Sequence, residues 1–296
     1  MRINGKEIAA KVFADLKKRV EELAKDGVVP HVVIILVGND PASIAYVRQK
    51  ELKAAEIGGK STLIQFDLSV SQDKLLKTIE QLNNDNNVHG IIVQRPLPPQ
   101  INNIEVNLAV DPKKDIDAFH PQTLFPMPLA AAVLKVLEKV HGSTPGVDAQ
   151  KPQGFVDWLK TKNIVVMGKG ETGGGPVITL LKKMNIEPIV IDSKTQNPES
   201  ITKHADIIVA TVGKPGLLTP DMLKKGVILL AVGMHRGKDG KLHGDYNENE
   251  ILNIAAAYTP IPGGIGPVNV AMLLTNLVKA SKLEQNPKIS PLDIVF

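Results

Sequence analysis

The sequence predicts an α/β protein of two domains, each built around a parallel sheet. Short runs of Val, Ile and Leu alternate with amphipathic helical patterns through nearly the whole chain. Continuous apolar runs of this kind are typical of parallel strands covered by helices on both faces. The length of 296 residues is enough for two domains of ordinary size.

The first half carries three apolar runs separated by two helical patterns. Buried strands are expected at HVVIILVG (31–38), STLIQFDL (61–68) and VHGIIVQRPLP (88–98). Helices are expected at DPASIAYVRQKELKAAEIGG (40–59) and SQDKLLKTIEQLNND (71–85). The order strand, helix, strand, helix, strand predicts that these strands run parallel.

The second half repeats the rhythm after a stretch rich in Pro and Gly. Strands are expected at NIVVMG (163–168), EPIVID (187–192), ADIIVATVG (205–213) and VILLAVG (227–233). Before them lie FHPQTLFPMPL (119–129) and HGSTPGVDAQKPQG (141–154), with a short helix expected between the two. We place the change of domain near residues 118–150.

Composition excludes several classes of protein. Apolar residues make up 43% and charged residues 22% of the chain, as in a globular protein with a sizeable core. There is no cysteine, so disulfides, thiolate metal sites and cysteine nucleophiles are ruled out. The net charge of +4 comes without a basic cluster interleaved with aromatics, so nucleic acid is not expected as a partner. No apolar run reaches signal-peptide or membrane-spanning length, so we expect a cytoplasmic protein without membrane contact.

The segment GKGETGGGP (168–176) has glycines in the spacing G-x-G-x-x-G, at Gly168, Gly170 and Gly173. A predicted strand precedes it and a predicted helix follows, with Pro176 in the first helical turn. Glycines let the backbone approach a pyrophosphate, and the helix N-terminus supplies N–H donors and partial positive charge. Asp192 ends the next strand, 24 residues after Gly168, close to where an acid binds an adenosine ribose. This context favours a dinucleotide site over a glycine-rich turn without a ligand.

The choice between NAD and NADP stays open at this stage. Asp192 favours the free 2′-hydroxyl of NAD, whereas Lys169, Ser193 and Lys194 offer groups for the 2′-phosphate of NADP. Either lysine can equally be a solvated surface residue.

Polar residues in the first half offer a candidate catalytic set. Tyr46 and Lys50 are four residues apart on a predicted helix, hence neighbours on one face, and a lysine beside an aromatic ring can transfer protons. Spacing alone nevertheless favours an ordinary exposed pair, with Ile44, Val47 and Leu52 supplying the packing. Gln94 ends an apolar strand, where ligands gather in open α/β sheets.

The segment DPKKDIDAFHP (111–121) carries three aspartates and a histidine. A metal site is conceivable, but acids alternating beside lysines are more typical of a solvated turn. We therefore predict no metal.

Taken together, these segments resemble the bifunctional methylenetetrahydrofolate dehydrogenase/methenyltetrahydrofolate cyclohydrolase family. The resemblance runs in order over residues 1–282 and includes the Tyr-x-x-x-Lys helix, the Val-Gln-x-Pro-Leu-Pro strand end, VGKPG, GKLHGDY and YTPIPGGIGPVNVAMLLTN. It implies a folate-binding catalytic domain (1–120 with 268–296), a Rossmann-type domain (140–267) and an active-site cleft between the two. It also implies a homodimer.

The resemblance assigns roles to particular residues. Lys50 would be the general acid/base of the cyclohydrolase step, Gln94 would orient it, Tyr46 would pack against the folate, and Asp117 would bind the pterin ring. The substrate-binding set would be Tyr46, Asp117, Pro262, Gly263 and Gly264. The cofactor-binding set would be Gly168, Lys169, Gly170, Gly174, Asp192, Ser193, Lys194, Val212, Gly213 and Ile265. The cofactor would be NADP, with NAD possible.

Departures from the family pattern gather on the cofactor side. Lys169, Gly170 and Gly173 stand where the family usually has Arg, Ser and Val, and Asp192 lies where it would repel a 2′-phosphate. The expected reaction is oxidation of methylenetetrahydrofolate followed by hydrolysis of the methenyl product. The alternatives are a cyclohydrolase with weak or lost dehydrogenase activity, a non-catalytic folate- or nucleotide-binding protein, and another two-domain dehydrogenase.

Overall fold

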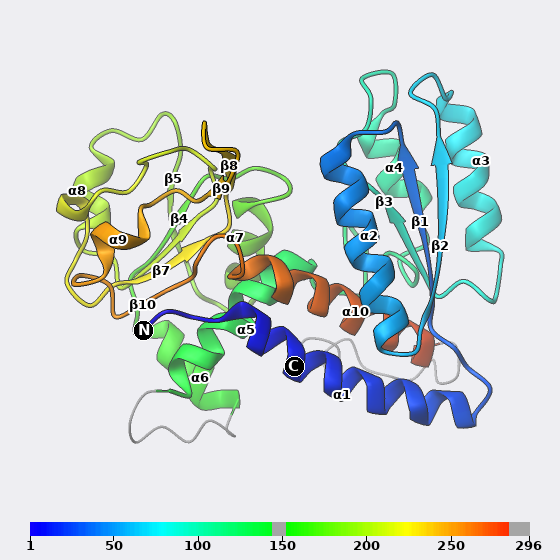
Figure 1. Cartoon of the computed structure of the whole chain (residues 1–296), viewed down its shortest axis with the longest axis horizontal. Coiled ribbons are helices and arrows are strands. Elements are labelled where there is room, and N and C mark those ends of the chain that lie inside the picture. Colours follow the sequence, from blue (N-terminus) through cyan, green and yellow to red (C-terminus); the bar gives the residue numbers. More distant parts are fainter. Residues whose placement is uncertain (144–151, 284–296) are drawn as a thin grey trace. The chain divides into compact units, whose positions relative to one another are not determined.

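The computed structural model describes residues 1–143 and 152–283, which form two compact units (Figure 1). One unit, called the sheet-A unit here, comprises Met1–Ala9 and Leu129–Asn269. The other, the sheet-B unit, comprises Ala10–Pro128 and the chain from Val270 onward. Most of the Pro- and Gly-rich segment predicted at 141–154, and residues 284–296 of the predicted catalytic domain, lie outside the described residues.

The sheet-B unit has three parallel strands in the order β2-β1-β3. They are β1 (His31–Val37), β2 (Lys60–Phe66) and β3 (Gly90–Val93). All residues of β1 and β3 are buried, as the continuous apolar runs predict. The expectation of a buried strand at 61–68 is wrong, because none of the residues of β2 is fully buried. Both β2 and β3 lie at edges of the sheet, but the chain at Asp115 bridges to Ile91 on the free side of β3.

Helices surround this sheet, and side chains fix where several of them begin. They are α2 (Pro41–Glu56), α3 (Gln72–Asn83), α4 (Asn103–Ala109) and the larger parts of α1 (Gly5–Lys25) and α10 (Ile265–Leu283). The Asp40 carboxylate accepts the Ser43 N–H at 2.8 Å, and Pro41 occupies the first helical position of α2. Ser71 caps α3 in the same way, through the Lys74 N–H.

The sheet-A unit has five parallel strands in the order β10-β7-β6-β4-β5. They are β4 (Ile164–Met167), β5 (Ile189–Ile191), β6 (Ile207–Ala210), β7 (Ile228–Ala231) and β10 (Ala257–Tyr258). The chain goes from β4 to one neighbour, β5, and then crosses to the other, β6. Ligands in open α/β sheets bind at the carboxyl ends of strands where the order reverses, which here means β4 and β6.

The remaining elements of this unit are short helices and one hairpin. They are α5 (Pro128–His141), α6 (Pro152–Lys160), α7 (Gly174–Lys183), α8 (Pro198–Thr202), the 3₁₀ turn Pro220–Met222, β8 (His235–Arg236), β9 (Leu242–His243) and α9 (Glu248–Ile251). Val165, Ile208 and Leu229, from three neighbouring strands, are completely buried in the core. The predicted α/β class with parallel sheets is confirmed.

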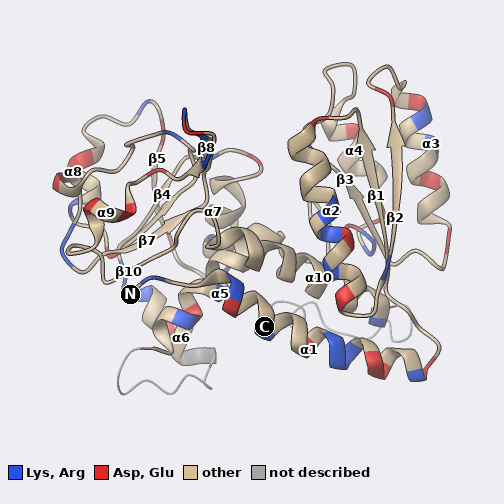
Figure 2. Cartoon of the chain, viewed as in Figure 1, with Lys and Arg blue, Asp and Glu red and all other residues tan. Residues whose placement is uncertain are grey.

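Charged side chains of both signs are interspersed along the outer helices, as α1 and α3 show (Figure 2). Among the described residues, no helix is both long and apolar enough to cross a membrane. Within the same residues, no group of three or more His, Asp or Glu side chains is arranged to hold a metal ion.

Candidate active site

Lys50 lies on the buried face of α2. That face is formed by Ser43, Val47, Lys50 and Ala54, and Lys50 is only 8% exposed. The lysine Nζ donates to Gln94 Oε1 at 3.1 Å. The interpretation of Tyr46 and Lys50 as an ordinary exposed pair is therefore wrong for Lys50. Ile44 and Leu52, which were expected to supply packing, are exposed instead.

Gln94 is held from both ends at the carboxyl end of β3. Its backbone N–H donates to the carbonyl of Ile35 on β1 at 2.8 Å, so the residue continues the sheet ladder. Its side-chain Nε2 donates to the carbonyl of Arg95 at 2.8 Å. With the amide nitrogen engaged there, the amide oxygen faces Lys50 as an acceptor.

Asp117 completes a cluster of three polar side chains. Its Oδ2 lies 3.9 Å from Lys50 Nζ, and the two side chains are 24% and 11% exposed. Tyr46 lies one helical turn before Lys50 and is 40% exposed. Partial burial raises the pKa of its phenol, so the ring stays neutral. The structure thus brings Lys50, Gln94 and Asp117 together, with an aromatic ring on the same helix.

Asp115 organises the turn that carries Asp117. It is 4% exposed, and its two carboxylate oxygens accept the N–H groups of Ala118 at 3.1 Å and His120 at 2.7 Å. Burial raises the pKa of Asp115 to about 6, against the opposing effect of these hydrogen bonds. Ala118 has a φ of 63°, which L-residues rarely adopt.

The expectation of a solvated turn at 111–121 is therefore wrong. Lys114 is also buried, and its Nζ donates to the carbonyls of Leu82, Asn83 and Asp85 at 3.2, 2.9 and 2.7 Å. The turn is drawn inward because Asp115 forms a β-bridge with Ile91. The sequence analysis considered Asp115 only as part of a conceivable metal site, and it did not predict that this carboxylate is buried and holds the turn.

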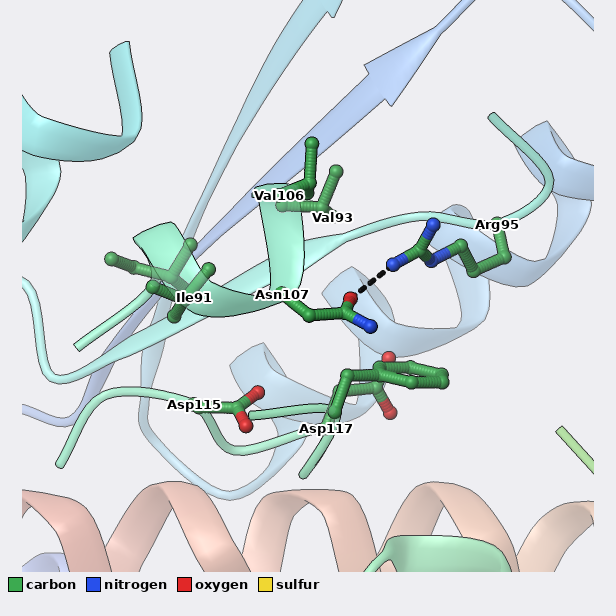
Figure 3. Close-up of a pocket in the computed structure, with 9 residues that line it drawn as sticks. Ile91, Val93, Arg95, Val106, Asn107, Asp115 and Asp117 are labelled. Atoms are coloured by element: carbon green, nitrogen blue, oxygen red, sulfur yellow. Dashed lines mark hydrogen bonds between the residues drawn. The ribbon is translucent and has the colours of Figure 1, made fainter. Parts of the chain in front are cut away.

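A small pocket in the sheet-B unit adjoins this cluster through Asp117 (Figure 3). It is lined by Ile91, Val93, Arg95, Val106, Asn107, Val110, Asp115, Asp117 and Phe119. The Arg95 guanidinium donates to the side chains of Asn103 and Asn107 and lies 5.2 Å from the Phe119 ring centre. Arg95 and the candidate substrate-binding carboxylate of Asp117 therefore line the same small pocket.

The glycine loop follows β4 in the sheet-A unit. Gly168 has a φ of +92°, and its N–H donates to the carbonyl of Ile191 at 2.8 Å. A Cβ at Gly174 would lie 2.8 Å from the carbonyl carbon of Gly168, so a side chain there has no space. At Gly170 a Cβ would meet no described atom within 4 Å. The loop is tight where it turns into α7 and open at Gly170.

The N-terminus of α7 fits an anionic ligand. Its N-cap is Gly173, so no side chain caps this ten-residue helix. In the first turn Pro176 has no N–H, and the Gly175 N–H donates to the Gly170 carbonyl at 3.0 Å. A glycine turn that leads into a helix N-terminus without a side-chain cap is a feature that binds a pyrophosphate, so the residues present fit a dinucleotide.

Lys169 and Asp192 form an ion pair beside this loop. Lys169 Nζ lies 2.7 Å from Asp192 Oδ2, with the side chains 64% and 23% exposed. The hydrogen bond from Lys169 lowers the pKa of Asp192 to about 2. The Lys194 N–H donates to Asp192 Oδ1 at 2.9 Å. Ser193 and Lys194 are themselves exposed.

The loop after β6 follows the second of the two strands, β4 and β6, between which the strand order reverses. Val212 is 50% exposed, and Gly213 has a φ of +72° with the backbone of Met234 against the position of its absent Cβ. The fully buried Asp245 accepts the Lys214 N–H at 2.7 Å, and burial raises its pKa. Asp245 was not among the predicted site residues. Its carboxylate fixes this loop through the hydrogen bond from the Lys214 N–H.

The last predicted site segment precedes α10. Pro262 is exposed, and Gly263 has a φ of +102° with its carbonyl accepting the Gly5 N–H at 2.9 Å. Gly264 is buried, and Ile265 is 3% exposed at the first position of α10. This glycine turn is thus hydrogen-bonded to the first residue of α1, which belongs to the sheet-A unit.

One unit carries a partly buried Lys–Gln–Asp cluster and the other a turn that fits a dinucleotide. Together they define the class of protein, a nucleotide-dependent enzyme. Comparison with known families agrees: residues 3–117 match the tetrahydrofolate dehydrogenase/cyclohydrolase catalytic domain, and residues 155–285 match its NAD(P)-binding domain. The chain belongs to the tetrahydrofolate dehydrogenase/cyclohydrolase family.

Individual relatives cover nearly the whole chain. The bifunctional protein FolD of Lactococcus lactis is 37% identical over 291 residues, with 96% of this chain and 98% of the relative covered. A crystal structure of the bifunctional FolD from Campylobacter jejuni superposes with a TM-score of 0.87 at 33% identity, covering 96% of this chain and 99% of that chain. The Trypanosoma brucei enzyme, solved with NADP and an inhibitor, gives a TM-score of 0.84 at 29% identity, covering 97% and 98%.

Proposed function

We propose that this chain oxidises 5,10-methylenetetrahydrofolate with NADP or NAD to the 5,10-methenyl derivative and hydrolyses that product to 10-formyltetrahydrofolate. The family and its two named domains support both reactions. The observation that carries the assignment is Lys50 Nζ, buried on α2 at 3.1 Å from Gln94 Oε1 and 3.9 Å from Asp117 Oδ2. A lysine held in this way can move protons at a substrate bound beside it.

Lys50 acts as the acid and base of the hydrolysis. As a water oxygen bonds to the one-carbon bridge of the methenyl cation, Lys50 takes the proton that the water loses. The C–N5 bond then breaks, N5 receives a proton from Lys50, the new hydroxyl loses its own proton and the formyl group remains on N10. One proton is released overall. A substrate cation nearby disfavours the ammonium form of the lysine, which prepares it to act as the base.

Gln94 and Asp117 position the reacting groups. Gln94 restrains Lys50 because its own amide is fixed by the Arg95 carbonyl and the sheet ladder. Asp117 accepts hydrogen bonds, and the adjacent N–H donors of a pterin ring match a carboxylate. Tyr46, exposed by 40%, offers its ring to pack against the folate.

The cofactor side uses the sheet-A unit. The glycine loop with Gly168, Gly170 and Gly174 would hold the pyrophosphate, and the residues around Asp192 the adenosine ribose. Val212, Gly213 and the segment from Pro262 to Ile265 would lie along the rest of the cofactor and the folate, as the family pattern implies. A bound nicotinamide would supply the hydride acceptor for the oxidation of the one-carbon bridge.

Two assays on the purified chain test the proposal. Methylenetetrahydrofolate is added with NADP and then with NAD, and the near-ultraviolet absorbance of reduced nicotinamide is followed. Loss of methenyltetrahydrofolate is measured separately, against the spontaneous rate. We expect a signal in both. Hydrolysis without reduction of either cofactor would show that the chain is a cyclohydrolase without dehydrogenase activity. Binding of folate or nucleotide without turnover in either assay would show a non-catalytic binding protein.

We further propose that the chain works as a homodimer on soluble one-carbon folates in the cytoplasm. The family resemblance supports the homodimer and the one-carbon folate substrates. Light scattering after gel filtration measures the mass directly, and a single peak at the mass of one chain would refute the dimer.

A further inference from the structure

The choice between the two cofactors depends on the residues at the carboxyl end of β5. Strands β4 and β5 pair in register, with Met167 opposite Ile191, and the Gly168 N–H donates to the Ile191 carbonyl. Lys169, two residues after β4, and Asp192, directly after β5, therefore lie together at the carboxyl ends of these two strands. In dinucleotide-binding folds an acid at this place accepts hydrogen bonds from the adenosine ribose.

The Asp192 carboxylate is fixed in place and ionised. Its Oδ1 accepts the Lys194 N–H at 2.9 Å and lies 3.2 Å from Thr195 Oγ1, while Oδ2 accepts from Lys169. The Asp192 backbone N–H donates to Thr195 Oγ1 at 3.0 Å, which closes the turn. At neutral pH the carboxylate therefore carries a full negative charge on a defined position.

From this arrangement, and assuming the proposed dehydrogenase function, we propose that Asp192 makes the chain bind NAD more tightly than NADP. A ribose 2′-hydroxyl can donate to a carboxylate oxygen, each of which accepts more than one hydrogen bond. Lys169 keeps its ion pair while this happens, so nothing is lost on binding NAD.

A 2′-phosphate meets the opposite situation. The phosphate carries nearly two negative charges and would lie beside the negatively charged Asp192 carboxylate. Repulsion between like charges at contact distance opposes its binding. Lys169 can turn towards the phosphate only by leaving Asp192 unpaired next to it. A lysine also lacks the two-pronged donor geometry with which arginine binds phosphate. Ser193 and Lys194 add one neutral and one solvated group, which does not remove the repulsion.

The test is calorimetric titration of NAD and of NADP, without folate, into the unaltered chain and into Asp192→Ser and Asp192→Asn. We expect the unaltered chain to bind NAD at least about tenfold more tightly, the size of one hydrogen bond to a charged group. In both variants the ratio of the dissociation constants of NADP and NAD should fall towards one, mainly because NADP binds more tightly than it does to the unaltered chain. Asp192→Asn keeps the shape of the side chain, so its result does not depend on repacking.

Asp206→Ser is the matched control. Asp206 also forms an ion pair with a lysine, Lys224 at 2.6 Å. It directly precedes β6, however, and so lies at the amino ends of the strands, on the other side of the sheet from Asp192 and the cofactor loop. Its removal should leave the ratio of the two dissociation constants unchanged. Tighter binding of NADP by the unaltered chain, or an unchanged ratio in both Asp192 variants, would overturn the inference while the proposed function stands. If neither NAD nor NADP bound, the dehydrogenase function itself would be refuted.

Discussion

Gly174 should be the most sensitive position of the cofactor loop. It is the first residue of α7, and a Cβ there would lie 2.8 Å from the carbonyl carbon of Gly168 and closer still to its oxygen. In real structures a Cβ atom essentially never lies within 3.0 Å of a heavy atom of another, non-neighbouring residue. The opposing atoms are backbone, so the substitution Gly174→Ala forces the loop and the start of α7 apart.

The structure sets the expected size of the effect. Forcing a methyl group into a packed site costs about 1–3 kcal/mol, and a clash with backbone belongs at the upper end. A loss of about 3 kcal/mol lowers the Tm of a domain of this size by roughly 6–12 °C. The same displacement moves the first-turn N–H groups of α7, so both NAD and NADP should bind at least about tenfold more weakly.

Thermal unfolding and calorimetric titration measure the two effects. Gly170→Ala is the control for stability, because no described atom lies within 4 Å of a Cβ at that position and its Tm should match that of the unaltered chain. If Gly174→Ala kept both its Tm and its affinity for the cofactors, the close packing of this loop would not be what positions the dinucleotide.

Two further predictions concern the turn that carries Asp117. Asp115 has a folded pKa of about 6, above the ordinary value of 3.8, so the folded state holds more protons between these values and the contribution of Asp115 to the unfolding free energy falls as pH rises through them. The change is about 3 kcal/mol, so the unfolding free energy of the unaltered chain minus that of Asp115→Asn should rise by about this amount as pH falls from 7 to 4, and a difference that does not change with pH would contradict this assignment. Lys114→Met removes the ammonium donor of three partly exposed carbonyls, those of Leu82, Asn83 and Asp85, and should lower the unfolding free energy in urea by about 1.5–3 kcal/mol; an unchanged midpoint would show that these carbonyls find other donors.

Much of the fold could be predicted from local sequence, because buried parallel strands are continuous apolar runs. The runs at 31–38, 163–168 and 205–213 contain β1, β4 and β6. The exposure of β2 could not be predicted, since it depends on the strand order and on which edge strand other chain covers, and not on the strand itself. The buried face of α2 was also mispredicted: Ile44 is exposed and Lys50 buried, because packing against β1 and β2 selects the face.

The site shows the same division. Lys50, Gln94 and Asp117 could each be selected as candidates from their neighbours in sequence, but their distances depend on how α2, β3 and the turn after Lys114 pack together. The burial of Asp115 was missed because it follows from a bridge to Ile91, which is distant in sequence. Lys169 and Asp192 were considered separately, for opposite cofactors, and only the pairing of β4 with β5 joins them.

The most direct test of the proposed chemistry is the rate at which Lys50→Met hydrolyses methenyltetrahydrofolate. Loss of a general acid/base should slow the reaction by about 10²–10⁴-fold. Lys53→Met is the control, because Lys53 lies on the same helix but pairs with Glu56 at 2.6 Å instead of with the cluster. We predict a rate for Lys53→Met like that of the unaltered chain. Equal rates for Lys50→Met and the unaltered chain would contradict the assignment of Lys50 as the proton-transferring group.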